Sequence, residues 1–397
     1  MKSEKQGQNA GSASRRVLIV LRRLGMGGIE QASRTLAQAF TAEGHEVHMM
    51  VLKGKVDYAP AAPVRLHRLD LEKMQRRSAA GIAWHLVSRL MLRPLLPRSG
   101  FVWQGMGCGR LFEAAVADIE RQSGRFDLIL VRGQGAFEML WTVRDPRLWR
   151  VVESAASDFK GRLGRWLRHC LYHDHRLICV SNGVRSRLLE QIGRHRTQVA
   201  DCRVVYNAVP MSLIRTLAKK PCAPDFNEPY LVHVARLVPV KQQPLLLEAY
   251  ALARQKGLDL PLVIIGDGSE RSSLQALARR LDIASRVHFL GQQDNPYPWV
   301  AKAQAFVLSS RTEGLGLVLI EALALGTQCV ATDVPGGIRE VLIDEQRRLL
   351  AENRADSLAD KILEAVQKPV RVDDAWLERF SEPNIIRQYL SLIPPLD

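Results

Sequence analysis

The chain opens with a strand–helix–strand pattern of apolar positions. An apolar run at 17–21 precedes a helical pattern at 29–43, and a second apolar run follows at 46–52. Two strands joined through a helix predict a βαβ unit and a parallel sheet. Further strands of this sheet are expected at 126–131, 150–152 and 177–180, with helices at 111–122 and 183–192.

The same alternation restarts more regularly in the second half. Strands are expected at 230–235, 262–265, 287–290, 305–308 and 329–332, and helices at 243–256, 270–281, 297–303, 317–325 and 338–342. This pattern predicts a second parallel α/β domain. A last helical pattern covers 375–393.

The length of 397 residues exceeds what one hydrophobic core usually supports. We therefore expect an α/β protein of two Rossmann-like parallel-sheet domains that face each other across a cleft. In such sheets ligands bind at the carboxyl ends of the strands. The expected limits are 1–14 for a disordered tail, 15–210 for the N-terminal domain, 211–228 for a linker, 229–374 for the C-terminal domain, and 375–397 for a C-terminal helix that packs back on the first domain.

The charge balance is strongly basic. Lys and Arg number 56 against 41 Asp and Glu, a net charge of +15. Nucleic acid, anionic lipid or an anionic substrate would explain this charge, and so would a generally basic proteome without a specific partner. Aromatic residues make up only 6% and no nucleic-acid-binding motif is present, so nucleic acid is not expected as a partner.

The cysteines and the apolar runs suggest a cytoplasmic protein. The six cysteines form no Cys-x-x-Cys pair, which fits a reducing compartment. No stretch approaches the roughly 20 apolar residues of a membrane-spanning helix. Membrane association is therefore expected to be peripheral, on the inner face. The basic, apolar segments 73–98 and 161–169 are the candidates for contact with anionic lipid; alternatively, each is a helix packed on its domain with arginines outside.

The segment 309–321, SSRTEGLGLVLIE, carries the most informative pattern. It follows a predicted strand and opens a predicted helix. Gly314 and Gly316 allow close backbone approach, and the helix start near Leu317 offers free amides and a positive dipole end for phosphate. Glu313 and Glu321 supply carboxylates that accept hydrogen bonds from sugar hydroxyls.

Two cations follow the strand at 230–235. Arg236 ends that strand and Lys241 lies five residues further on, before a helix. At a sheet rim such a pair neutralises a diphosphate, although most Arg and Lys are simply solvated surface charges. The neighbouring strand ends at Gly266-Asp-Gly, a common strand-to-helix turn that carries little weight alone.

Gly25-Met-Gly-Gly28 after the first strand is a further candidate for contact with phosphate or sugar. A nicotinamide-binding fingerprint would need an acidic residue at the end of the second strand. That strand ends in Leu52-Lys53, so a nucleotide-cofactor oxidoreductase is not expected.

Together these motifs resemble the GT-B glycosyltransferases, and in particular glycosyltransferase family 4. The resemblance rests on the order and separation of Arg236 and Lys241, of Glu313 and Glu321, and of Gly27-Gly28-Ile-Glu30. It covers nearly all of 15–393 and is strongest over 204–345.

The resemblance implies a role for each matched position. The N-terminal domain would bind the acceptor and the C-terminal domain the nucleotide sugar. Arg236 and Lys241 would bind the donor diphosphate, Glu313 the transferred sugar and Glu321 the ribose hydroxyls. The amides of Gly314, Leu315, Gly316 and Leu317 would meet sugar and phosphate, with Gly266 near them and Gly27 and Gly28 opposite. The family retains anomeric configuration and typically needs no metal or other cofactor; the absence of an Asp-x-Asp motif agrees with that expectation.

Some features depart from the family pattern or leave alternatives. Many members carry a His in the first domain where this chain reads Val151-Val-Glu-Ser-Ala155, so Glu153 or Ser154 is expected to take that position. His173-Asp-His175 has poor spacing for a metal site on a helix, and a surface or interface role is favoured. The expected activity is transfer of a sugar to a glycan or lipid-linked acceptor in cell-surface polysaccharide or lipopolysaccharide synthesis. The alternatives are a nucleotide-sugar epimerase on a similar scaffold and a non-enzymatic, basic membrane-surface protein.

Overall fold

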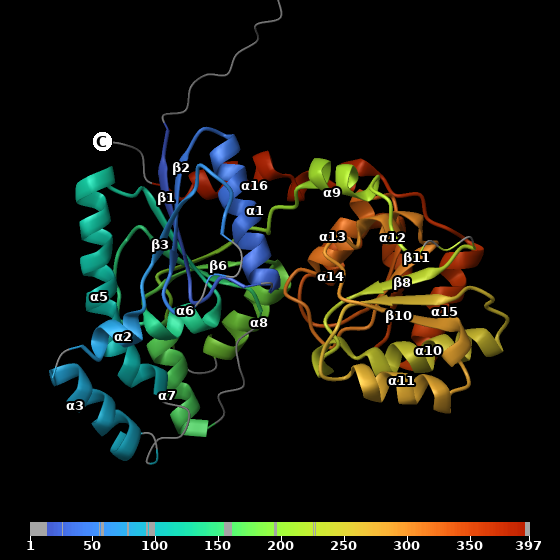
Figure 1. Ribbon diagram of the computed structural model, residues 1–397, viewed down its shortest axis with the longest axis horizontal. Coiled ribbons are helices and arrows are strands. Elements are labelled where there is room, and N and C mark those ends of the chain that lie inside the picture. The colour runs from blue at the N-terminus through green and yellow to red at the C-terminus, as the bar shows by residue number, and fades with distance from the viewer. Residues whose placement is uncertain are drawn as a thin grey trace, which may run out of the picture. The chain divides into compact units, whose positions relative to one another are not determined.

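The structure is a computed structural model that describes residues 14–393, apart from 26, 55, 57–58, 78, 93, 95–99, 155–160, 194–196, 225 and 227. Most of the tail expected at 1–14 and part of the basic segment 73–98 lie outside the described residues. The rest forms two parallel sheets with helices on both faces (Figure 1).

The first sheet has seven strands in the order β3-β2-β1-β4-β5-β6-β7. Its centre is fully buried, because 17–20 in β1 have no exposed surface and read as a continuous apolar run, as parallel sheets require. The strands are β1 (Arg16–Leu21), β2 (Glu46–Val51), β3 (Arg65–Arg68), β4 (Leu128–Arg132), β5 (Leu148–Val152), β6 (Arg176–Cys179) and β7 (Asp201–Val204).

Helices connect these strands. Figure 1 shows α1 and α5 on opposite sides of the sheet. The helices are α1 (Gly28–Ala42), α2 (Leu71–Gln75), α3 (Ala79–Val87) continued by a π-helical turn η1 (Ser88–Leu92), α5 (Gly100–Ser123), α6 (Gln134–Met139), α7 (Gly161–Tyr172) and α8 (Asn182–Gly193).

The second sheet has six strands in the order β10-β9-β8-β11-β12-β13. The order reverses between β8 and β11, which is where open α/β sheets bind ligands. The strands are β8 (Leu231–Val234), β9 (Leu262–Ile265), β10 (Val287–Gly291), β11 (Ala305–Leu308), β12 (Cys329–Thr332) and β13 (Leu350–Ala351).

The second sheet is covered on both faces. One face packs on α10, α11 and α15 through a single core cluster, and α12 and α13 lie on the other side (Figure 1). The elements are α9 (Met211–Ala218), η2 (Pro239–Lys241), α10 (Gln243–Gln255), α11 (Arg271–Arg280), η3 (Ala284–Arg286), α12 (Tyr297–Lys302), α13 (Leu317–Ala324), α14 (Ile338–Val341), η4 (Asp344–Leu349), α15 (Ala355–Gln367), η5 (Asp374–Phe380) and α16 (Glu382–Leu390).

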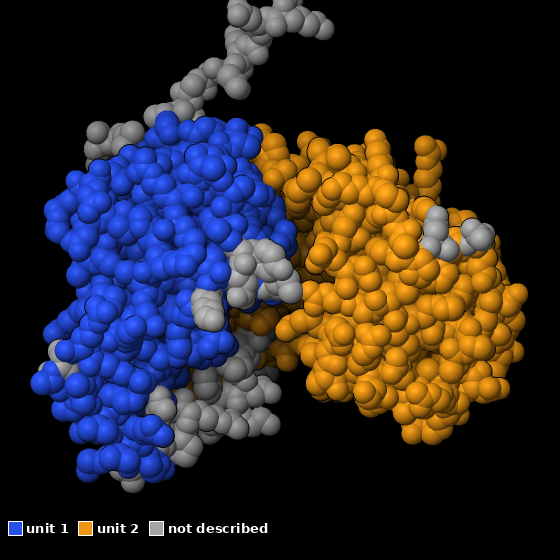
Figure 2. All heavy atoms as spheres, viewed as in Figure 1, with its two compact units in different colours: residues 1–149, 392–397 blue, residues 150–391 orange. Residues whose placement is uncertain are grey.

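The chain divides into two compact units, coloured separately in Figure 2. Unit 1 contains Met1–Trp149 with Leu392–Asp397, and unit 2 contains Arg150–Ser391. The last strands of the first sheet and α8 therefore group with the second sheet in unit 2. The domain limits expected from the sequence, and the packing of the C-terminal helix on the first domain, stay predictions.

Several elements differ from the sequence expectations. The helix expected at 111–122 begins at Gly100, the expected linker contains α9, and 375–393 forms a 3-10 segment followed by α16 rather than one helix. The helix α9 forms because Ile214 is buried against neighbouring helices. The helix α15 was missed, although Leu358, Ala359, Ile362 and Ala365 have helical spacing and are fully buried. Among the described residues, every helix is too short or too polar to cross a bilayer.

Candidate active site

The predicted donor-binding residues of the second half follow adjacent strands of the second sheet. The loop after β8 carries Arg236 and Lys241, and the loop after β11 carries Glu313. Because β8 and β11 are hydrogen-bonded neighbours, both loops leave the same edge of the sheet at the point where the strand order reverses. The candidate residues therefore lie at the edge where open α/β sheets bind ligands, and their contact with a donor stays a prediction.

Lys241 and Glu313 form a partly buried ion pair. Lys241 Nζ lies 2.6 Å from Glu313 Oε1, and the hydroxyl of Ser310 donates to the same oxygen at 2.5 Å. The side chains keep 20% and 12% of their surface exposed, so water reaches the pair only partly. Among the described residues no donor contacts Glu313 Oε2, which leaves one carboxylate oxygen able to accept a hydroxyl hydrogen bond.

Arg236 is exposed, and its guanidinium has no hydrogen-bond or ion-pair partner among the described residues. Its loop is nevertheless held from beneath, because Gln243 Nε2 donates to the Arg236 carbonyl at 2.9 Å. Gln243 also contacts Nε2 of buried His233, whose Nδ1–H donates to the Val307 carbonyl at 2.8 Å. Burial lowers the pKa of His233 to about 4, so the ring is neutral and supports the loop without charge.

His233 and Gln243 were not predicted as site residues. The available signal was one polar ring inside the otherwise apolar strand Leu231-Val-His-Val234. A buried histidine must be hydrogen-bonded, and here its partners connect β8 and β11 to the Arg236 loop.

Gly266 is explained by packing between backbones. A Cβ at Gly266 would lie 1.9 Å from the Ala235 carbonyl oxygen, and φ is +135°. The amide of Leu237 also donates to the Asp267 carbonyl at 2.9 Å. The loops after β8 and β9 are therefore fastened together; whether Gly266 also contacts the donor stays a prediction.

The turn before α13 is equally constrained. A Cβ at Gly314 would lie 1.9 Å from the Glu153 carbonyl oxygen, and Gly316 has φ of +89° as the N-cap of α13. No side chain caps this helix, so its first amides, beginning at Leu317, are available for an anion. Leu315 is buried beneath the turn and anchors it.

Glu321 lies on α13 and is hydrogen-bonded to the Tyr297 hydroxyl of α12. Glu321 keeps part of its surface accessible, but its carboxyl group itself is buried in the protein. Burial raises the pKa of Glu321 to about 7, and the Tyr297 hydrogen bond opposes that rise. Near neutral pH this group therefore changes between a protonated carboxyl, which can donate a hydrogen bond, and a carboxylate, which can only accept one.

Glu153 and Ser154 follow β5 and belong to unit 2. The Glu153 carboxylate accepts a hydrogen bond from Asn207 Nδ2 at 3.2 Å, and its carbonyl meets Gly314 as described above. Ser154 is exposed. The structure thus brings Glu153 to the Gly314 turn, whereas which residue takes the position of the family histidine stays a prediction.

A partly exposed carboxylate on α14 ties α8 to this region, and it was not predicted. Glu340 accepts hydrogen bonds from the Asn182 and Gly183 amides at 2.9 and 2.8 Å and from the Tyr206 hydroxyl at 3.0 Å. Burial and the Glu340 charge raise the pKa of Tyr206 to about 12. A carboxylate at a helix N-terminus is a favourable cap, so Glu340 holds the start of α8 beside the loop after β12.

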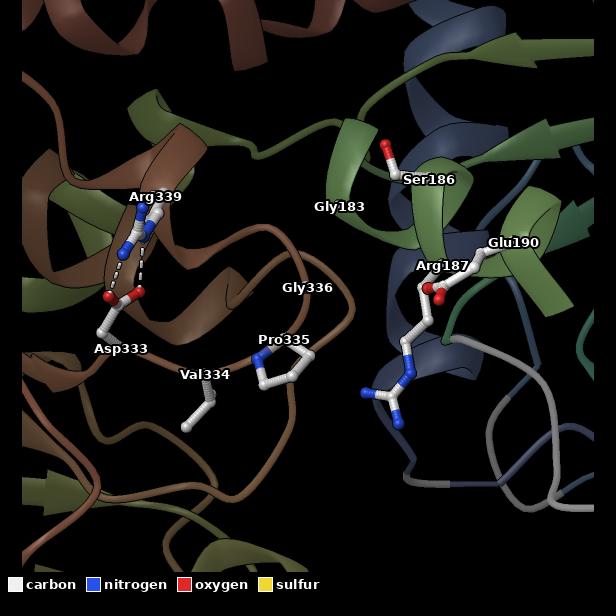
Figure 3. Close-up of a pocket in the computed structure, with 9 residues that line it drawn as sticks. All are labelled: Gly183, Ser186, Arg187, Glu190, Asp333, Val334, Pro335, Gly336 and Arg339. Atoms are coloured by element: carbon white, nitrogen blue, oxygen red, sulfur yellow. Dashed lines mark hydrogen bonds and ion pairs between the residues drawn. The ribbon is translucent and has the colours of Figure 1, made fainter.

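A pocket of about 620 Å³ lies between α8 and that loop (Figure 3). Arg339 forms a bidentate pair with Asp333 on one side, and Arg187 and Glu190 project from α8 on the other. None of the predicted site residues lines this pocket. It adjoins the site loop, because a Cβ at Gly336 would lie 1.6 Å from the Glu313 carbonyl oxygen and the Thr312 hydroxyl donates to the Pro335 carbonyl at 3.1 Å.

Gly27 and Gly28 lie at the start of α1 in unit 1. Gly27 is the N-cap in an extended conformation, and no side chain caps the helix. A Cβ at Gly28 would meet nothing within 4 Å, so that position faces open space. Their placement opposite the donor stays a prediction.

The His173-Asp-His175 segment has a structural explanation. His173 stacks on His169 with ring centroids 4.1 Å apart, and His175 is buried. The described part of the chain contains no group of three or more metal-ligating side chains.

Comparison with known proteins agrees with this geometry. The sequence model of Glycosyltransferase Family 4 matches residues 26–213, and that of Glycosyl transferases group 1 matches residues 215–380. The N-acetylgalactosamine-N,N'-diacetylbacillosaminyl-diphospho-undecaprenol 4-alpha-N-acetylgalactosaminyltransferase of Campylobacter jejuni is 32% identical over 49% of this chain and 52% of its own length. The lipopolysaccharide core biosynthesis glycosyltransferase LpsE of Rhizobium meliloti is 31% identical over 50% and 56%. The matched regions thus span about half the length of these relatives.

The fold is shared over a longer stretch. The crystal structure of Anabaena HepE in complex with UDP and glucose superposes with a TM-score of 0.67 at 18% identity, covering 95% of this chain and 98% of that one. The two family models meet between the two sheets, and the structural match extends across both. The chain belongs to the family 4-like glycosyltransferases of the GT-B fold.

Proposed function

We propose that this chain transfers a sugar from a nucleoside-diphosphate donor to a hydroxyl of a glycan or lipid-linked acceptor, with retention of configuration and without a metal. The observation that carries this proposal is the Lys241–Glu313 pair beside the uncapped start of α13. A cation, a carboxylate oxygen without a partner and free amides together match a sugar joined to a diphosphate.

Each group has a distinct task in the proposed site. Arg236 extends freely from a fixed loop and takes one phosphate through a bidentate contact. Lys241 lies between Glu313 and the diphosphate and shares its three N–H donors between them. Glu313 orients the sugar through the oxygen that Ser310 and Lys241 leave open, and Glu321 accepts from the ribose hydroxyls.

In the reaction, the bond between the anomeric carbon and the phosphate oxygen breaks while a bond to the acceptor oxygen forms. The acceptor proton passes to an oxygen of the departing diphosphate, so nucleoside diphosphate and glycoside are the only products. Arg236, Lys241 and the α13 amides stabilise the charge that develops on the leaving group, which is the role otherwise given to a metal. Retention follows when the acceptor attacks the face that the leaving group vacates.

The relatives suggest the class of acceptor. The Campylobacter protein is named for transfer to a diphospho-undecaprenol-linked sugar and the Rhizobium protein for lipopolysaccharide core synthesis. We infer a role in cell-surface polysaccharide or lipopolysaccharide synthesis at the cytoplasmic side of the membrane. Because HepE was solved with UDP and glucose, a UDP-sugar is the first donor to test.

The decisive experiment starts from a panel of nucleotide sugars screened by thermal shift. A donor that binds the native state raises the melting temperature. At a concentration of one hundred times its Kd, it adds about 2.7 kcal/mol to the free energy of unfolding. The selected donor is then incubated with and without a polyprenyl-diphosphate-linked or lipopolysaccharide-core acceptor. We expect release of nucleoside diphosphate only with acceptor, and NMR of the product should show the anomeric configuration of the donor.

Other outcomes would replace the proposal. An altered sugar in the incubation with donor alone would identify an epimerase. Vesicle binding without any thermal shift by nucleotide sugars would identify a non-enzymatic surface protein. An inverted product, or activity abolished by a chelator and restored by a divalent cation, would overturn the retaining or metal-independent part.

A further inference from the structure

The helix α3 and its π-helical continuation η1 are arranged with their apolar side toward solvent. Ile82, Leu86 and Leu90 are 49%, 50% and 68% exposed, and Val87 and Met91 next to them are also exposed. We call these five residues the α3 face. Their spacing of four residues places them on one side of the helix.

The opposite side of the same helix contacts the protein through two small residues and the indole ring of Trp84. Gly81 and Ser88 are buried there, and Trp84 Nε1 donates to the Trp103 carbonyl of α5 at 2.8 Å. The helix is thus fixed to unit 1 in this orientation. Figure 1 shows α3 at the edge of that unit, beyond α2 and away from the strands.

This clustering is unusual within the described part of the chain. Of the nine exposed large hydrophobic side chains there, five belong to the α3 face. Single exposed apolar residues need no explanation, but a contiguous apolar patch marks a surface that another molecule covers.

The charge around the patch indicates what covers it. From Lys73 to Phe112 the chain contains seven Lys or Arg residues and no Asp or Glu. Arg76 and Arg77, which follow α2, and Arg89, which lies in η1 between Leu86 and Leu90, are exposed. An exposed apolar face within a segment whose only Lys, Arg, Asp or Glu charges are positive complements a bilayer with anionic headgroups.

A second copy of the chain fits the same surface less well. A two-fold interface centred on the α3 face would bring each copy's cations against those of the other, with no carboxylate in the segment to compensate. The other basic segment, in α7, shows the opposite arrangement. Leu167, Cys170 and Leu171 are buried there and Arg162 and Arg165 face outward, although Trp166 is 37% exposed and Arg168 is buried.

We propose that the α3 face docks on an anionic phospholipid surface. Ile82, Leu86, Leu90 and their neighbours enter the boundary between headgroups and acyl chains, and Arg76, Arg77 and Arg89 contact the phosphates. This goes beyond the transfer reaction and does not depend on it, because the surface lies on α2–η1 and not on the loops of the second sheet.

The test uses the full chain in vesicle flotation. Wild type is expected to float with vesicles of phosphatidylglycerol and phosphatidylcholine, and not with phosphatidylcholine alone. The double variant Leu86→Gln/Leu90→Gln should lose vesicle affinity roughly tenfold or more, because two apolar side chains no longer enter the bilayer. Leu213→Gln, at a leucine of α9 that is 49% exposed, is the matched control and should float as wild type does.

A second variant separates charge from apolar contact. Arg77→Gln/Arg89→Gln should weaken binding several-fold on phosphatidylglycerol vesicles at low salt, and the difference should shrink at high salt. This variant keeps every apolar side chain, so it tests the same face even if the leucine double variant does not fold. Transfer to a soluble acceptor and the nucleotide thermal shift should stay at wild-type values in both, which distinguishes this proposal from the transferase assignment.

The proposal is overturned if wild type does not float with phosphatidylglycerol vesicles, or if folded Leu86→Gln/Leu90→Gln floats equally well. Light scattering without lipid gives the remaining outcome. A wild-type dimer that this double variant converts to monomer would show that a second copy covers the α3 face.

Discussion

The loops of the second sheet and the α3 face both present cationic side chains, but the two regions differ in how firmly the protein holds them. In the loops, Lys241 is held by its pair with Glu313, and Gln243 fixes the backbone from which the free Arg236 side chain extends. On α2–η1, arginines are exposed and large apolar side chains lie in solvent, while the inward contacts come from small residues and Trp84. The loops are arranged for a ligand of defined geometry, whereas the α3 face offers apolar area and positive charge.

This difference follows from the physics of the two tasks. Stabilising a developing charge requires donors that are already oriented, so backbones approach closely and glycines are needed. Contact with a bilayer requires only apolar area and a positive potential, and neither depends on an exact side-chain position. Substitutions should therefore have steep effects in the loops and graded effects on the α3 face.

The largest expected effect is on Lys241. Lys241→Ala should lower turnover by about 10²–10³-fold, because it removes a cation from the leaving group and leaves Glu313 without its partner. Steady-state kinetics with the donor found by thermal shift would measure this. Lys256→Ala, which removes another ion-paired lysine at Asp360, is the control and should retain wild-type turnover. Wild-type activity in folded Lys241→Ala would break the assignment of the site.

The next effect tests the close approach of backbones. Gly314→Ala would place a methyl group 1.9 Å from the Glu153 carbonyl oxygen, so one of the two backbones must move. We expect a loss of about 1–3 kcal/mol in the free energy of unfolding and a large fall in turnover. Gly193→Ala is the matched control, since a Cβ there meets nothing within 4 Å. Equal melting temperatures for the two variants would show that the turn is not constrained as described.

Glu321 gives a smaller effect that depends on pH. Its folded pKa of about 7 lies above the usual 4.5, so the folded protein holds this proton more tightly than the unfolded chain does. Its contribution to the free energy of unfolding therefore falls as pH rises from 4.5 to 7 and stays low above that. Glu321→Gln should be as stable as wild type at pH 4.5 and more stable at pH 8, by about 1–3 kcal/mol.

The same titration should appear in donor binding. Ribose hydroxyls donate to a carboxylate better than to a neutral acid, so calorimetry should show nucleotide affinity rising from pH 6 to pH 8 in wild type. The rise should be absent in Glu321→Gln. A parallel pH profile in both proteins would remove Glu321 from the ribose contact.

The smallest expected effect is that of a substitution on the α3 face on the free energy of unfolding. Leu86→Gln should change the free energy of unfolding by less than about 0.5 kcal/mol, because half of that side chain is already in water. Leu247→Gln, at a fully buried position of α10, should cost several kcal/mol by comparison. A large loss in Leu86→Gln by thermal melting would mean that the α3 face packs inside the protein in solution.

The sequence was sufficient for two parallel-sheet domains, whereas the donor-binding role of the positions it singled out stays a prediction. Continuous apolar runs such as 17–21 and 262–265 are typical of buried strands of a parallel sheet, and both became strands with a neighbour on each side. The family was indicated by the order of Arg236, Lys241, Glu313 and Glu321 along the chain. The loops that carry Arg236, Lys241 and Glu313 are far apart in the sequence but follow neighbouring strands, so the fold brings them together. Strands β3, β7 and β13 and helix α9 were missed because short elements carry too few periodic positions.

Only the tertiary structure decided how those residues are supported and which surfaces stay open. The contacts of His233, Gln243 and Glu340 join residues far apart in the chain, and local sequence contains no trace of such partners. The segments around α3 and α7 have the same arginine-rich, apolar composition, yet one turns its leucines outward and the other inward. Composition sets what a helix can bury, but the neighbours that pack against it determine which side is covered.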